Sequence, residues 1–184
     1  MRESVKQFLI NHKELLNKPI KEITIKDIQQ LYTDASNEEP FDADSFCVGE
    51  VTQILLKKLN PLDYLTSIPD SYLAGSNITE FKVPNHIKTI GAGAFYGCKE
   101  LLKVDIPQSV SEIRMYAFAE CEKLRVLFIK NKYPTIDETT FQNTEHIAKI
   151  YYAGNSDDWE LIWPYNPPPA IRIECTDKIL GPYI

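Results

Sequence analysis

The sequence predicts an α+β protein in which a small N-terminal helical bundle is followed by a short solenoid of stacked repeats. Two observations support this: a 23-residue unit occurs twice between residues 78 and 129, and three amphipathic segments precede it. Self-similarity at a period of roughly 20–29 residues is typical of solenoids. The landmark residues of the two copies are Pro84 and Pro107, Phe95 and Phe118, and Cys98 and Cys121.

Seven positions are apolar or thiol in both copies, whereas residues between them change freely, as Lys88 does to Ser111. A single unit cannot bury its apolar face, so the copies must stack and share a core. The alternation in 104–106 predicts a short strand. Repeating the 23-residue step finds a weaker third unit. The seven first-copy positions are Ile87, Ile90, Phe95, Cys98, Leu101, Val104 and Ile106, and the backward step reaches Tyr72, Gly75, Ile78, Phe81 and Val83.

At these residues the chain resembles the BspA-type leucine-rich repeats of bacterial proteins. The matching segments read VPNHIKTIGAGAFYGCKELLKVDIP and IPQSVSEIRMYAFAECEKLRVLFI. Two later segments, IYYAGNSDDWELI and IRIECTDK, are similar to the end of such arrays. The resemblance covers residues 64–180. It implies a right-handed leucine-rich-repeat solenoid used for binding, often on cell surfaces, with no shared ligand and no catalytic residues.

Three helices are expected before the repeats. Apolar residues at three- and four-residue steps predict a first helix from Val5 to Leu16 and a second over 25–32, with Thr24 as its N-cap. A third is predicted over 46–59, where Asn60-Pro61 ends it, and one helical turn follows around 61–65.

After the repeats, Ser156 is expected to cap a short helix that contains Trp159. A stiff proline-rich segment at 163–169 then leads to a last strand at 170–175. The sequence leaves open whether the N-terminal helices only cap the solenoid or form a second functional domain. The predicted divisions are a helical domain or cap at 1–62, the leucine-rich repeats at 63–153 and a C-terminal capping segment at 154–184.

Composition narrows the class of partner. The net charge is −6 and the pI is about 5.1, which argues against nucleic acid as a partner, since that requires a basic stripe. No apolar run is long enough for a membrane-spanning helix, which needs about 20 residues, so no membrane partner is expected. The N-terminus lacks the apolar core of a signal peptide. The predicted location is therefore cytoplasmic, with a surface or virion location as the alternative if a leader has been removed.

No motif indicates catalysis, so the chain is predicted not to be an enzyme and to need no cofactor. There is no Cys-x-x-Cys and the three histidines are scattered, so no metal site is expected. Cys98 and Cys121, at the same position of adjacent copies, are predicted to be small packed hydrophobes, although a disulfide between them is possible by distance. Gly91-Ala-Gly93 is only weak evidence for a phosphate-binding loop, and the next copy has Arg114 there, so glycine is not expected to be required.

The expected partner-binding surface is the outward face of the repeat strands. The 23-residue step gives one column of Lys82, Asp105, Phe128 and Tyr151, and another of Glu80, Lys103, Val126 and Lys149. The later members form an apolar and aromatic cluster, which either a terminal segment covers or a partner protein contacts. Self-association through the same face is a further interpretation. The predicted contact residues are Lys103, Asp105, Val126, Phe128, Lys149 and Tyr151.

A second candidate is an acidic loop between the second and third helices. It contains five carboxylates and no cation, but their spacing does not match a calcium-binding loop. The loop is interpreted either as a solvated connection that caps the next helix or as an acidic contact for a basic partner. Its carboxylates are Asp34, Glu38, Glu39, Asp42 and Asp44.

Together these patterns predict a non-enzymatic protein-binding module that uses the leucine-rich-repeat sheet face. One hypothesis is that it acts inside a bacterial cell as a phage or mobile-element modulator of a host protein. The alternative is a structural or adhesin-type component of a surface or virion assembly. A third hypothesis is an enzyme accessory subunit whose acidic loop contacts a basic enzyme.

Overall fold

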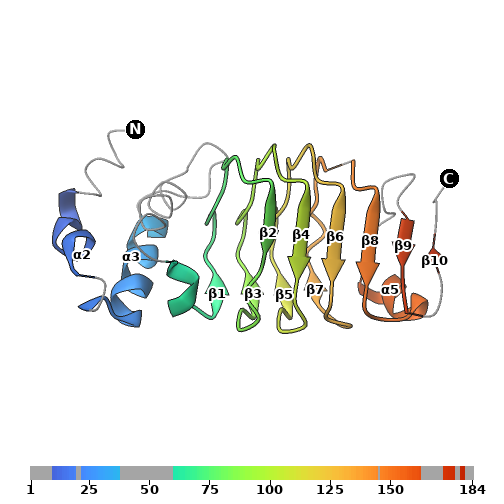
Figure 1. Ribbon diagram of the computed structural model, residues 1–184, viewed down its shortest axis with the longest axis horizontal. Coiled ribbons are helices and arrows are strands. Elements are labelled where there is room, and N and C mark those ends of the chain that lie inside the picture. Colours follow the sequence, from blue (N-terminus) through green and yellow to red (C-terminus); the bar gives the residue numbers. More distant parts are fainter. Residues whose placement is uncertain are drawn as a thin grey trace.

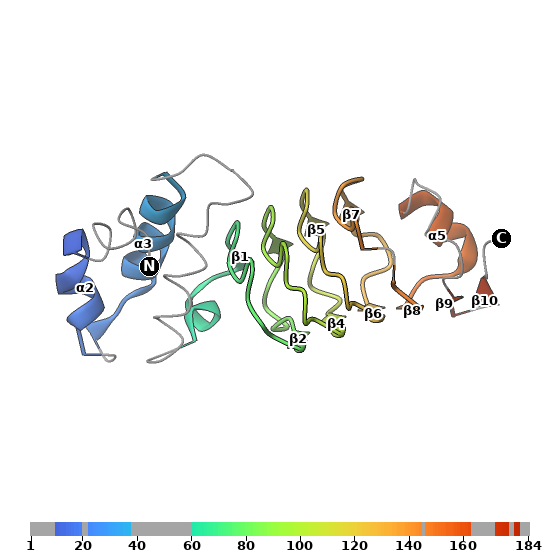
Figure 2. The same ribbon diagram turned by 90° about the horizontal axis from the view of Figure 1, so that it is seen from above.

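The computed structural model describes residues 10–19, 22–37, 60–144, 146–162, 172–176 and 179–180. These residues form the predicted solenoid, with helices at its N-terminal end and a short helix near the other end (Figure 1). Seen from above, the strands of the repeats lie in two rows on opposite sides of the core (Figure 2). The predicted fold class is confirmed.

Each repeat contributes one strand to each of two sheets, and neighbouring strands of the repeats are parallel. The strands of the four-stranded sheet are β1 (Ser67–Ile68), β3 (Thr89–Ile90), β5 (Glu112–Ile113) and β7 (Thr135–Ile136). The six-stranded sheet has the order β10-β9-β8-β6-β4-β2. Its strands are β2 (Glu80–Lys82), β4 (Lys103–Ile106), β6 (Val126–Ile129), β8 (Lys149–Tyr152), β9 (Arg172–Glu174) and β10 (Ile179–Leu180), the last of which is antiparallel to β9.

The strand register follows the 23-residue period of the sequence. Lys103 pairs with Val126, and Val126 pairs with Lys149. Strand β9 continues the same spacing, because Lys149 pairs with Arg172. The last predicted strand is therefore a further parallel member of the repeat sheet, which β9 and then β10 extend beyond the recognisable repeats.

The first repeat is one residue shorter than the sequence period suggests. Ser67 pairs with Thr89, which is one position short of a full 23-residue step. Leu73 N donates to Ala94 O, just as Phe95 N donates to Ala117 O in the next repeat. The backward extension by 23 was therefore wrong at two positions, since the equivalents of Phe95 and Cys98 are Leu73 and Ser76 instead of Tyr72 and Gly75.

A row of stacked phenylalanines runs through the core. The ring centroids of Phe95 and Phe118 are 5.0 Å apart with nearly parallel planes, and both side chains are fully buried. Phe81 lies 4.7 Å before this pair and Phe141 lies 5.6 Å after it. Phe95, Phe118 and Phe141 occupy the same position of successive repeats, so one residue type fills the core there. Phe81 belongs to a different position, that of Val104, and its ring packs at a tilt against Phe95.

A second row consists of small side chains that donate hydrogen bonds to backbone carbonyls. Cys98 Sγ donates to Leu73 O (3.1 Å), Cys121 Sγ to Phe95 O (3.2 Å) and Thr144 Oγ1 to Phe118 O (2.8 Å). Burial raises the pKa of both thiols. The two cysteines are free and buried as predicted, and they also satisfy carbonyl groups of the preceding repeat.

Gly91 corrects a further expectation, because the fold does require glycine there. A Cβ at this position would lie 2.5 Å from Asp70 Oδ1 and 2.6 Å from Ile68 O.

The N-terminal helices are α2 (Lys13–Asn17) and α3 (Ile25–Asn37), followed by the 3₁₀ turn η2 (Pro61–Tyr64) where one was predicted. Thr24 caps α3 as expected: Asp27 N donates to Thr24 Oγ1 (3.2 Å), and Thr24 N donates to Asp27 Oδ2 (2.8 Å). The helix extends past its predicted end at Tyr32. The first five residues of the predicted first helix, the third helix at 46–59 and the proline-rich segment at 163–169 lie outside the described residues.

Helix α3 packs against the first repeat. Ile28 and Leu31 are fully buried, and the rings of Tyr32 and Tyr72 are 6.0 Å apart. These side chains belong to the same hydrophobic cluster as the repeat core. The helix and the solenoid therefore share one core.

Helix α5 (Ser156–Ile162) closes the described repeats at the other end. Its cap is Asn155, because Asp158 N donates to Asn155 Oδ1 (2.7 Å); the prediction of Ser156 was one residue late. Trp159 is 2% exposed and packs edge-on against Tyr152.

Replacing Phe118 by alanine should lower the free energy of unfolding by about 3–5 kcal/mol, because it opens a cavity between two stacked rings. Phe141→Ala should cost less, since Phe141 is only partly buried. Urea unfolding followed by circular dichroism measures both. If both substitutions lowered the free energy of unfolding equally, the buried position of Phe118 between two rings would not contribute extra stability.

Stability at acid pH should depend on Asp27. Hydrogen bonds from the Thr24 backbone and from Lys18 lower the pKa of Asp27 to about 2. Its contribution is therefore complete above its unfolded pKa of about 3.9 and is lost as the pH falls through 2. The urea midpoints of wild type and Asp27→Asn should differ at pH 5 and converge near pH 2; a constant difference would exclude this contribution.

Candidate functional site

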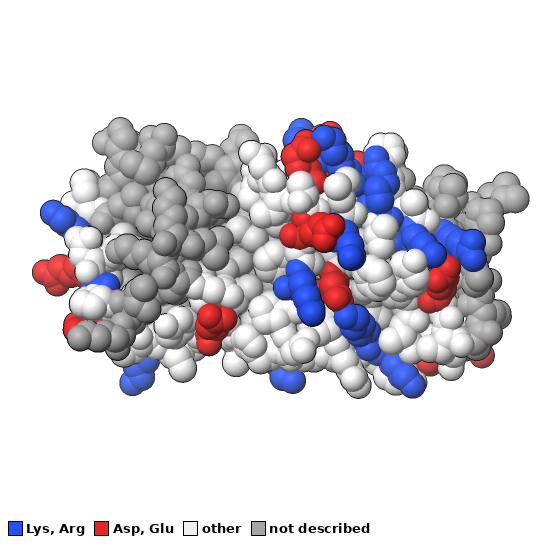
Figure 3. Space-filling view, viewed as in Figure 1, with Lys and Arg blue, Asp and Glu red and all other residues white. Residues whose placement is uncertain are grey.

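The outward face of the six-stranded sheet carries two columns of side chains set by the strand register. Figure 3 shows this face, where lysines and arginines gather with a few acidic groups over β4, β6 and β8. All six predicted contact residues lie on these three strands. One column is Glu80, Lys103, Val126, Lys149 and Arg172, and the other is Lys82, Asp105, Phe128, Tyr151 and Glu174.

Alternation along each strand separates this face from the core. In β4, β6 and β8, buried residues such as Leu127 and Ile150 alternate with half-buried ones. Successive side chains of a strand point to opposite sides of its sheet, so the half-buried residues form one continuous outer surface.

An aromatic stack lies in the middle of the surface. The rings of Phe128 and Tyr151 are 4.5 Å apart and nearly parallel. Lys149 Nζ lies 4.4 Å from the centroid of Tyr151, and Lys103 Nζ lies 5.6 Å from that of Phe128. Both rings are half-buried. The expected exposed cluster is thus a preformed stack flanked by lysines, whose charge is attracted to the ring faces.

Ion pairs surround the stack. Lys130 Nζ lies 2.6 Å from Asp105, and Glu174 contacts both Lys149 Nζ (2.8 Å) and Arg172 Nε (3.4 Å). The hydrogen bond to Glu174 raises the pKa of Lys149, and one to Tyr151 adds to this effect. These contacts hold the charged side chains in place around the rings.

Arg172 and Glu174 were missed by the sequence analysis, although the signal was present. One further 23-residue step from Lys149 and Tyr151 reaches them. They were placed in a predicted last strand, but the columns were not extended across the proline-rich segment that separates this strand from the recognisable repeats.

The family model for the BspA type leucine rich repeat region matches residues 53–160, in six copies. The chain belongs to this family. Leucine-rich repeats of this family generally mediate protein–protein interaction or form surface modules, and the family is typically non-enzymatic. A comparison with curated proteins finds no match.

Two solved structures are similar to this BspA-type chain. One is a leucine-rich repeat protein from Bacteroides ovatus, with 22% identity and a TM-score of 0.45, over 50% of this chain and 26% of that one. The other is a leucine rich cell surface protein from Faecalibacterium prausnitzii, with 18% identity and a TM-score of 0.36, over 50% and 36%. The match spans about a quarter to a third of those proteins' length.

Of the five carboxylates in the predicted acidic contact, only Asp34 lies among the described residues. Asp34 lies within α3 instead of a loop, where it accepts a hydrogen bond from Gln30 (2.7 Å) and contacts His12 (3.0 Å). The His12 contact lowers the pKa of Asp34. The prediction that Asp34 belongs to a loop is therefore wrong. Glu38, Glu39, Asp42 and Asp44 lie outside the described residues.

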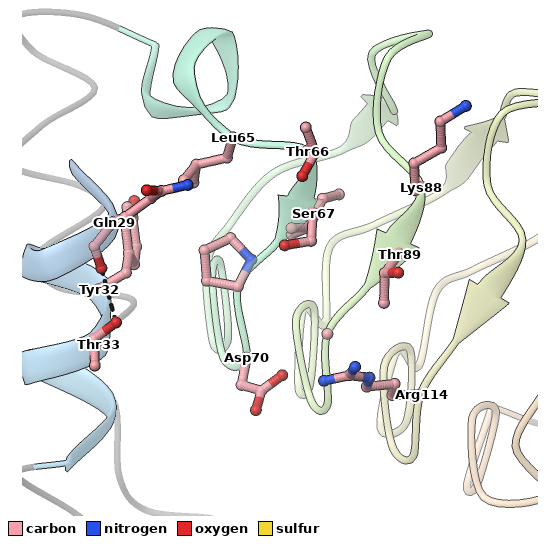
Figure 4. A pocket seen from close by; sticks show the side chains of 13 residues that line it. Gln29, Tyr32, Thr33, Leu65, Thr66, Ser67, Asp70, Lys88, Thr89 and Arg114 are labelled. Carbon is pink, nitrogen blue, oxygen red and sulfur yellow. Dashed lines mark hydrogen bonds between the residues drawn. The ribbon is translucent and has the colours of Figure 1, made fainter. Parts of the chain in front are cut away.

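A cleft of about 660 Å³ lies between α3 and strands β1 and β3 (Figure 4). Its lining is about equally polar and apolar, and two of its charged groups have local partners: Asp70 accepts from Ala92 N (2.7 Å) and Arg114 donates to Glu112 (3.1 Å). No histidine or cysteine is among the described residues that line it. These residues therefore offer neither a thiol nor an imidazole for chemistry.

The described residues contain no candidate metal site and no candidate membrane-spanning helix. No group of three or more histidine, cysteine, aspartate or glutamate side chains in that part of the chain is placed to hold a metal ion. No described helix is long and apolar enough to span a bilayer. The sheet face is thus the best-supported candidate site.

The stack itself is testable by a double-mutant cycle. Phe128→Ala and Tyr151→Ala, made singly and together, should show a coupling free energy of about 0.5–1.5 kcal/mol, because the rings contact each other directly. Urea unfolding gives the four stabilities. Phe128→Ala with Met115→Ala, on the turn after β5, serves as the control pair and should be additive.

Proposed function

We propose that this chain is a protein-binding module whose contact surface is the outward face of the six-stranded sheet. The observation that carries the proposal is the Phe128–Tyr151 stack, held at the centre of a charged rim. Protein interfaces have this arrangement, in which aromatic side chains supply most of the affinity and charged groups surround them.

In this proposal the residues have distinct roles. Val126, Phe128 and Tyr151 form the apolar centre that a partner side chain covers. Lys103 and Lys149 lie beside the rings and, with Asp105, form the rim that orients the partner. Because the rings are already stacked and flanked, little side-chain entropy is lost when the partner binds.

The proposal extends to the ends of the chain. Residues 1–62 act as a cap on the first repeat, supported by the core that α3 shares with the solenoid. Residues 154–184 close the other end, where Trp159 is buried. The identity of the partner would distinguish two biological settings. One is modulation of a host protein by a phage or mobile-element product, and the other is a structural or adhesin role in a surface or virion assembly.

The test compares two double variants as bait in native lysate. In Phe128→Asp/Tyr151→Asp the stack is replaced by charge. In the control, Met115→Asp/Tyr133→Asp, two exposed apolar residues outside this face are changed in the same way. Both must show wild-type circular dichroism and a cooperative urea transition before use.

A specific partner should be retained by wild type and by the control, and lost from the stack variant. Loss of an aromatic anchor commonly costs about 2 kcal/mol or more, so affinity for the purified partner should fall at least about 30-fold. Equal binding by all three proteins would reject the sheet face. If wild type elutes as an oligomer that only the stack variant disrupts, the face is a self-association surface and the structural setting is favoured.

A further inference from the structure

The candidate face carries more positive than negative charge, although the whole chain has a net charge of −6. Among the described residues of the two columns and Lys130, which directly follows β6, five cations stand against three carboxylates. The cations are Lys82, Lys103, Lys130, Lys149 and Arg172, and the carboxylates are Glu80, Asp105 and Glu174.

Most of the negative charge on this face is already neutralised within the protein. Lys130 holds Asp105, with 2.6 Å and 2.7 Å to its two oxygens. Glu174 is held by two cations, Lys149 and Arg172. A basic partner would therefore find few free carboxylates.

Two of the described lysines on this face are not neutralised in this way: Lys103, beside the aromatic stack, and Lys82, one strand further away. No carboxylate among the described residues lies within ion-pair distance of Lys82 or Lys103. Glu80 is the strand-register partner of Lys103 and lies two residues before Lys82, but its carboxylate forms no ion pair with either lysine. Lys103 instead places its ammonium 5.6 Å from the centroid of Phe128.

We propose that the face binds an acidic segment of a partner protein, with one aliphatic or aromatic side chain on the Val126–Phe128–Tyr151 centre and carboxylates over Lys103 and Lys82. This inference rests on the proposed function and adds the chemistry of the partner. The net charge of the chain does not oppose it, because charges separated by more than about 8 Å are largely screened at physiological ionic strength.

The geometry also sets the spacing of the motif. Neighbouring strands are about 4.8 Å apart, so Lys103 on β4 and Lys82 on β2 lie roughly 5 and 10 Å from the centre of β6. An extended chain advances about 3.3 Å per residue. The acidic residues therefore lie about one to three positions from the apolar anchor.

The experiment selects random 12-residue peptides, displayed on phage, against the immobilised full-length chain. Three variants are screened in parallel: the stack variant Phe128→Asp/Tyr151→Asp, the charge variant Lys82→Gln/Lys103→Gln, and a control, Lys99→Gln/Lys123→Gln. The control removes two exposed lysines from the turns outside the sheet face. The best-enriched peptide is then synthesised, and its affinity is measured by fluorescence anisotropy.

The proposal expects peptides that are rich in Asp and Glu within three positions of an apolar residue and that depend on the stack. The charge variant should bind the synthetic peptide about tenfold more weakly, with a flatter salt dependence, and the control should bind it as wild type does. Stack-dependent peptides that are neutral or basic, or that bind the charge variant normally, would overturn the acidic assignment and leave the proposed function standing. Failure to enrich any stack-dependent peptide would overturn both.

Discussion

Every part of the described solenoid depends on the contact between identical positions of successive repeats. Phe95 and Phe118 stack face to face, and Cys98 and Cys121 each donate to a carbonyl of the preceding repeat. A residue inserted into one repeat would move all its later side chains off their counterparts. The core therefore maintains the 23-residue interval over most of the array. The interval from the first repeat to the second is one residue shorter, and there Leu73 occupies the position that Phe95 has in the next repeat.

This constraint acts on the inner face and leaves the outer face free. Because strand residues alternate between core and solvent, fixing the inner register also fixes which outer residues become neighbours, without restricting their identity. Each outer column is thus a row of variable side chains at constant spacing. The Phe128–Tyr151 stack, with the cations of neighbouring strands beside it, is one product of this arrangement. The residues of such a binding surface can therefore be substituted without destabilising the core.

The two ends of the solenoid are closed by different means. At the start, α3 places Ile28 and Leu31 against the first repeat and shares its core. At the other end, β9 extends the six-stranded sheet in register, and the antiparallel β10 follows it. In both cases apolar surface that a repeat would otherwise expose is buried by a segment that is not a repeat.

The sequence by itself determined the period, most core positions, and the strands and outer columns of one sheet as far as Tyr151, because a repeated pattern states directly which residues are equivalent. It did not predict the second strand of each repeat, which forms the four-stranded sheet. It could not show that Asp34 belongs to α3 and contacts His12, or that Gly91 makes room for Asp70, since these contacts join segments with no shared pattern. Only the tertiary structure continued the columns to β9. It also decided which charges neutralise one another, because ion pairing depends on side-chain distances that a column order does not specify.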